Sequence, residues 1–137
     1  MTKRNKIIYW IATIWLSLGM LSTGVVQLLK LKGDGPGSLD TMTHLGYPTY
    51  FVTILGVSKI LGIVALLIPK YPLVKEWAYA GFFFMMSGAI FTHIAAGNSI
   101  SEIFPSLLLL ILIVISWYFR PSDRKIVSVD HLNKSIA

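Results

Sequence analysis

Five polar side chains in or beside long apolar stretches are the residues of this sequence best suited to chemistry. They are Gln27, Lys59, Glu76, Tyr79 and His93. The amine, amide and imidazole groups among them can hydrogen-bond a carbonyl group of a bound molecule. We therefore treat the five residues as candidates for a ligand-binding site.

Lys59 is the most unusual of the five, because it interrupts an apolar run from residue 50 to residue 68. If that run forms a helix, Lys59 lies about 13 Å below the outer end of the helix, at about 1.5 Å per residue. A lysine at the centre of a membrane helix costs about 2.5–3.5 kcal/mol on insertion scales. Gly56 and Gly62 lie on the same helical face, so a neighbouring helix can approach closely there.

Two interpretations of Lys59 follow. In the first, Lys59 faces the bundle interior and contacts Gln27, His93 or Glu102, directly or through water. In the second, its aliphatic stem lies along the helix and its ammonium reaches the interface, so that Lys59 only fixes the rotation of the helix. We favour the first, because charged residues inside membrane spans mostly face the interior and mark functional sites.

The other candidates also have structural alternatives. His93 shares one stripe of its helix with Tyr79, yet a histidine near the interface can simply be hydrogen-bonded and neutral. Glu76 differs from Lys59 in depth by about 13 Å and would approach it only through water. A glutamate at the start of a helix also interacts favourably with the helix dipole.

Several kinds of catalysis lack support in the sequence. It contains no cysteine, which excludes dithiol exchange. Haem held between two histidines would need a pair within the spans, and only His93 is in one. Neither a recognisable zinc spacing nor a nucleophile with a base at helical spacing is present. We therefore expect no catalytic residues and no metal site.

The elements that position these residues are four apolar blocks. Of 137 residues, 55% are hydrophobic and 13% are charged, whereas soluble domains carry about 25% charged residues. A helix needs about 20 apolar residues to cross a bilayer core of roughly 30 Å. We predict an all-α integral membrane protein of the cell membrane, a multi-pass, up-and-down bundle of four transmembrane helices within residues 1–119. The spans cover residues 7–29, 50–68, 77–96 and 103–119, and residues 120–137 form a polar tail predicted to be disordered and cytoplasmic.

Basic residues predict the orientation of the bundle. Nine of the twelve lysines and arginines lie in the N-terminal arm, the second loop and the tail, and two lie in the first loop. By the positive-inside rule, both the N and the C terminus are cytoplasmic. Because these residues flank the spans and form no dense patch, nucleic acid is not an expected partner.

The loops contain two helix-start signals. In the first loop, Ser38 can cap a short helix that has Asp40 in its first turn and ends at Gly46. This helix is interpreted as a plain connector, with a lid over the outer mouth as the alternative. In the third loop, Ser99 and Glu102 have the spacing of a capping box.

The segment from Leu45 to Gly97 resembles the DoxX-like family of small four-span membrane proteins. The resemblance rests on "LGYP", "KILG", "KEWAYAGF" and the "TH" near the end of the third span. It implies a four-helix membrane protein, and the family name derives from a subunit associated with a quinone-linked oxidase. Lys59, Glu76 and His93 match polar positions typical of this branch, whereas the better-known branch has an acidic residue in the second helix.

Three functions remain open from the sequence. In the first, the protein is an accessory membrane protein that binds a quinone or another lipophilic small molecule inside the bundle, beside a membrane redox partner. In the second it is a small transporter, although no carboxylate lies in mid-span to couple transport. In the third it is a purely structural assembly factor whose contacts are with the lipid bilayer and a partner protein.

Overall fold

The computed structural model describes residues 2–33, 35, 38–121 and 124. The described residues form helices and connecting turns, without a strand. The helices are α1 (Lys3–Leu28), α2 (Leu39–His44), α3 (Thr49–Leu67), α4 (Pro72–Ala95) and α5 (Ile100–Tyr118). All but the short α2 are long and apolar enough to cross a membrane. The predicted all-α class with four membrane-spanning helices is therefore confirmed.

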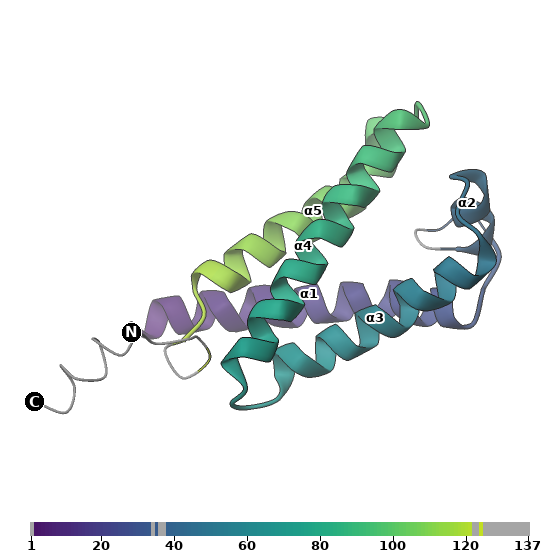
Figure 1. Ribbon diagram of the computed structural model, residues 1–137. Coiled ribbons are helices and arrows are strands. Elements are labelled where there is room, and N and C mark those ends of the chain that lie inside the picture. Colours follow the sequence, from purple (N-terminus) through teal and green to yellow (C-terminus); the bar gives the residue numbers. More distant parts are fainter. Residues whose placement is uncertain (1, 34, 36–37, 122–123, 125–137) are drawn as a thin grey trace, which may run out of the picture.

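The four long helices form a closed ring in chain order. α1 packs against α3 and α5, and α4 packs against α3 and α5. Short connections make α3, α4 and α5 antiparallel neighbours in turn, and α1 packs against α3 across the longer connection that contains α2, as expected for an up-and-down bundle. Figure 1 shows that the α4–α5 hairpin separates from the hairpin of α1 and α3, and that the separation widens toward the end of the bundle where α2 lies.

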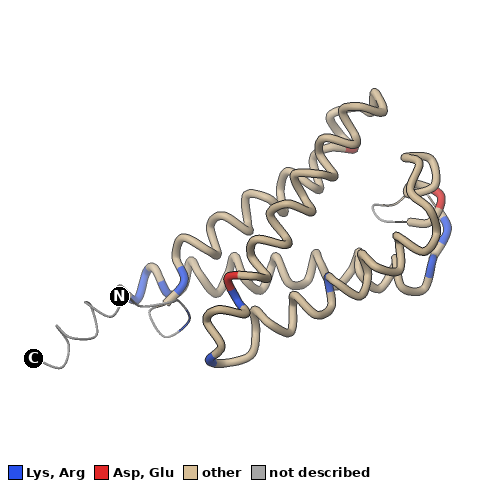
Figure 2. The backbone as a smooth tube through the Cα atoms, in the orientation of Figure 1, with Lys and Arg blue, Asp and Glu red and all other residues tan. Residues whose placement is uncertain are grey.

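The two ends of the bundle differ in charge. We call the end with the start of α1, the α3–α4 loop and the end of α5 the basic end, and the opposite end the α2 end. Lysines and arginines concentrate at the basic end, and most of the helical length between the ends is uncharged (Figure 2). The basic end carries Lys3, Arg4, Lys6, Lys70, Lys75 and Arg120.

The core consists of aliphatic, methionine and aromatic side chains from all four long helices. Its largest members include Leu16, Met20, Leu66, Phe82 and Leu112. Every long helix also exposes large apolar side chains on its outer face, among them Leu18, Leu61, Phe84 and Ile111. Such an exterior is stable where the surrounding solvent is hydrocarbon rather than water.

Two cations close the end of α3 at the basic end. The last carbonyl groups of a helix have no partner within the helix. Lys75 donates from Nζ to the Ala65 carbonyl at 2.8 Å and also to the Ile68 carbonyl. Arg124 donates from Nη1 to the Leu66 carbonyl at 2.9 Å. Positive charge at this helix end is favourable as well, because the helix dipole is negative there.

The short loop helix forms as predicted. Ser38 caps α2 by accepting a hydrogen bond of 3.3 Å from the backbone N–H of Thr41, and Gly46 follows the helix with φ of 92°. The second expected cap differs. Ser99 is the N-cap of α5 but makes no side-chain capping bond, since its hydroxyl lies 2.8 Å from that of Ser101 instead.

The helix bounds differ from the apolar blocks mainly at α4. This helix begins at Pro72 rather than at Trp77, because proline suits the first helical turn and the polar residues after it remain helical. Most of the tail predicted to be disordered lies outside the described residues, which include Arg120, Pro121 and Arg124.

Candidate functional site: a cavity between two helical hairpins

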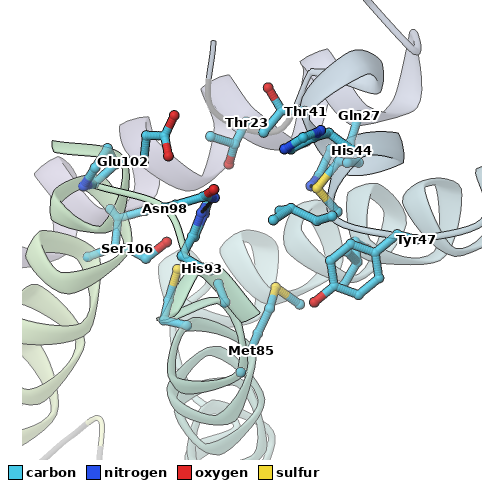
Figure 3. Close-up of a pocket in the computed structure, with 18 of the residues that line it drawn as sticks. Thr23, Gln27, Thr41, His44, Tyr47, Met85, His93, Asn98, Glu102 and Ser106 are labelled. Atoms are coloured by element: carbon cyan, nitrogen blue, oxygen red, sulfur yellow. Dashed lines mark hydrogen bonds between the residues drawn. The ribbon is translucent and has the colours of Figure 1, made fainter. Parts of the chain in front are cut away.

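A cavity of about 730 Å³ lies at the α2 end, lined by all five helices. Ligand-binding cavities commonly measure about 300–1,000 Å³. Figure 3 shows side chains from α1 and α2 facing others from α4 and α5 across this space. Its polar lining includes Thr23, Gln27, Lys59, His93, Asn98 and Glu102, and its apolar lining includes Phe51, Leu55, Met85, Met86 and Leu109.

Lys59 lies inside the bundle, as predicted. Its exposed fraction is 5%, and its Nζ donates a hydrogen bond of 3.0 Å to the Thr23 hydroxyl oxygen. The Thr23 hydroxyl is in turn 3.2 Å from the Gly19 carbonyl, to which it donates. This threonine therefore offers its oxygen to Lys59 as an acceptor. Among the described residues, its direct hydrogen-bond partner is Thr23, and Gln27, His93 and Glu102 line the same cavity.

Glycines bring α1 and α3 close together beside Lys59. A Cβ added at Gly24 would lie 3.3 Å from the Lys59 Cβ, and one at Gly56 would lie 2.9 Å from Leu28. Gly62 contacts the ring of Phe82 on α4. Gly56 therefore faces α1 and Gly62 faces α4, whereas the sequence suggested that both glycines pack against a single neighbouring helix.

Gln27 is the second polar group of this wall. It is 2% exposed, and its amide nitrogen lies 4.0 Å from the Met42 sulfur of α2. Its amide oxygen is buried without a hydrogen-bond partner among the described residues. Because Thr23 and Gln27 are four residues apart in α1, their side chains are neighbours on one face of the helix. We call Thr23, Gln27 and Lys59 the polar patch.

His93 belongs to the opposite wall of the cavity. Its Nδ1 lies 2.8 Å from the Asn98 amide nitrogen, in a contact that fixes the ring to the α4–α5 loop. The residue before it, Thr92, is hydrogen-bonded to the Tyr47 hydroxyl at 2.7 Å. This second contact joins the end of α4 to the segment between α2 and α3.

Glu76 is not part of the cavity lining. It lies at the basic end, where its carboxylate is 2.8 Å from Arg120 Nε and accepts from Trp117 Nε1 at 3.0 Å. These contacts join the start of α4 to the end of α5. Its geometry is that of an ion pair between helix ends.

Tyr79 also lies away from the cavity lining. Its hydroxyl is 2.8 Å from the Ser116 hydroxyl, which is 2.6 Å from that of Thr13. All three side chains are buried. They form a polar link among α1, α4 and α5 inside the apolar core. Of the five candidates, the structure thus brings three into one cavity and places two elsewhere.

Sequence reasoning missed Thr23 and Lys75. Thr23 could have been found by its spacing from Gln27, which puts both on one face of α1. Lys75 is only 1% exposed, but its position in a short polar segment gave no sign of burial.

The cavity wall combines polar and apolar groups. The described residues contain no group of three or more histidine, aspartate or glutamate side chains placed to hold a metal ion. The polar patch offers hydrogen-bond donors and a positive charge, and the remaining wall offers apolar contact. This combination suits a molecule with a polar head and a lipophilic body.

Comparison with known protein families gives a match over most of the chain. The family model described as the DoxX-like family matches residues 11–116, which is more than half of the chain. The matched range includes most of each long helix, the polar patch and His93. No curated protein and no solved structure matches the chain significantly.

Proposed function

This chain belongs to the DoxX-like family, and for this multi-pass membrane protein we propose a role in binding a lipophilic molecule between its two hairpins. The observation that carries the proposal is the polar patch in the wall of a 730 Å³ cavity. A charged group within an apolar bundle is costly unless it has a role or a partner. Lys59 has one hydroxyl partner among the described residues.

The composition of the cavity wall supports a ligand that is mostly apolar. Leu55 of α3 and Leu109 of α5 line it from opposite hairpins, and Met85 and Met86 of α4 lie between them in the ring. Methionine side chains adapt to ligands of irregular shape. A quinone fits this description, since its carbonyl oxygens would accept hydrogen bonds from the polar patch.

The proposed physiological role is that of an accessory protein. It would hold the lipophilic molecule within the bilayer and present it to a membrane redox partner. This role does not require catalysis by the chain itself.

Mass spectrometry of small molecules retained by gently purified protein tests this proposal. The wild-type protein is expected to retain a discrete lipophilic species, and Lys59→Met is expected to lose most of it. Lys32→Met is the control, because Lys32 is exposed and does not line the cavity. Extracts that contain only bulk phospholipid, equal in all three proteins, would contradict the proposal.

Measuring both partner assembly and ligand content in one variant distinguishes the proposed ligand-binding role from a purely structural one. If the protein is only an assembly factor, Lys59→Leu should leave its partner complexes intact and retain no less ligand than the wild type. If the protein presents a ligand, Lys59→Leu should assemble normally but lose the retained species. The two roles therefore predict different ligand contents for the same variant.

A further inference from the structure

The charge of Lys59 has no counter-ion among the described residues. The ion pair that they form joins Glu76 and Arg120 at the basic end. Asp40 and Glu102 also line the cavity, but neither is in ion-pair contact with Lys59. Asp40 accepts a hydrogen bond of 2.9 Å from the Gly33 backbone, and Glu102 is exposed at the start of α5.

Lys59 also has donor capacity to spare. An ammonium carries three N–H groups, and Thr23 is its hydrogen-bond partner in the described part of the chain. The Gln27 amide, whose contact is the weakly accepting sulfur of Met42, can turn its NH₂ group toward the same acceptor by rotating about its terminal bond. Two donors therefore lie on one wall, and one of them is positively charged.

We propose that the ligand of this cavity is an amphiphile with a single negatively charged head, such as a long-chain carboxylate. The carboxylate accepts hydrogen bonds from Lys59 and Gln27, and the alkyl chain lies against Leu55, Met85 and Leu109. This inference rests on the proposed function, because it names the head-group class of the ligand that the same cavity binds.

The physical reason is compensation of charge in a medium of low dielectric constant. A buried charge without a counter-ion is unfavourable, while a paired and hydrogen-bonded one is tolerated. An alcohol of the same chain length would accept a hydrogen bond but leave the positive charge uncompensated. An amine of that length would add a second positive charge and should be the weakest ligand.

Native mass spectrometry of the full-length chain in detergent gives an apparent Kd for each probe in turn. The probes are palmitate, the alcohol and the amine with the same alkyl chain, and a short-chain benzoquinone. Palmitate should bind about tenfold or more tightly than the alcohol, as expected for a hydrogen bond to a charged group. Lys59→Gln should abolish this preference, and Lys59→Arg should keep part of it. Lys32→Gln is the matched control and should bind every probe as the wild type does.

Equal binding of palmitate and the alcohol by the wild type would overturn the inference, whatever the variants do. A preference for palmitate that persists in Lys59→Gln would overturn it as well. If the benzoquinone binds in a manner that depends on Lys59 and palmitate does not bind, the head-group class is wrong and the proposed function stands. If no probe binds, both fail.

Discussion

Lys59 on α3 donates a hydrogen bond of 3.0 Å to the hydroxyl of Thr23 on α1, at the wall of the cavity between the hairpins. The contact links two helices that already approach closely through Gly24 and Gly56. The hydrogen bond thus has two effects. It holds the ammonium beside the cavity, and it makes the position of this ammonium depend on the packing of α1 against α3.

Removing the Thr23 hydroxyl should destabilise the protein through Lys59. Thr23→Val takes away the acceptor and leaves a buried ammonium unsatisfied, at a cost of about 1–3 kcal/mol. The midpoint of thermal unfolding in detergent should fall for Thr23→Val and stay unchanged for the exposed Thr43→Val.

The double variant Thr23→Val/Lys59→Met provides the control for this interpretation. It should recover much of the loss, because replacing both partners by apolar groups leaves neither unsatisfied. Strictly additive effects of the two substitutions would show that the hydrogen bond does not couple α1 to α3.

The sequence was sufficient to predict the architecture because a bilayer imposes strong constraints. Apolar blocks of about 20 residues can only be spanning helices in hydrocarbon. The short second and third loops also force α3, α4 and α5 to be neighbours in turn. The interior position of Lys59 followed from the same energetics. Its enclosure is confirmed by the structure.

The details of the site depended on tertiary packing. Thr23 was not identified as the partner of Lys59, because a threonine in an apolar helix can satisfy its hydroxyl on its own backbone. Glu76 and Tyr79 lie on the same helix as His93, but the sequence did not indicate that these two residues fall outside the cavity lining. Their contacts with Arg120 and Ser116 come from α5 or the residues just after it, and the pairing of distant helices cannot be derived from spacing within one.

Close packing of α1 and α3 should make Gly56 sensitive to a single methyl group. A Cβ at Gly56 would meet the Leu28 side chain at 2.9 Å and the Gly24 carbonyl at 3.1 Å, so Gly56→Ala should cost about 1–3 kcal/mol through overpacking. Gly81 is the matched helical control, because nothing lies within 4 Å of an added Cβ. Chemical denaturation in mixed micelles should show Gly81→Ala to be neutral or stabilising, and equal losses at both sites would contradict the packing described.

The caps on α3 should be visible in hydrogen exchange. Lys75→Met removes the donor to the Ala65 carbonyl, so the last turn of α3 should fray and its amides should exchange faster. Lys70→Met serves as the control, since Lys70 is exposed in the nearby loop between α3 and α4. Identical exchange of residues 62–68 in the two variants would show that Lys75 does not hold the end of the helix.

The orientation predicted from the basic residues can be measured directly, because the chain has no native cysteine. Lys32→Cys lies at the α2 end and Lys70→Cys at the basic end. A membrane-impermeant maleimide should label the first in intact cells and the second only after permeabilisation. The reverse pattern would place the termini outside the cell.

The most direct test of ligand binding in the cavity compares photocrosslinking at two leucines of α3. A photoreactive amino acid is placed either at Leu55, which lines the cavity, or at Leu61, which is 64% exposed on the outer face. Irradiation in membranes followed by intact-mass analysis should give one discrete lipophilic adduct at position 55 and a mixture of bulk phospholipids at position 61. The position-55 adduct should also disappear when Lys59→Met is introduced. The same phospholipid mixture at both positions would contradict the account.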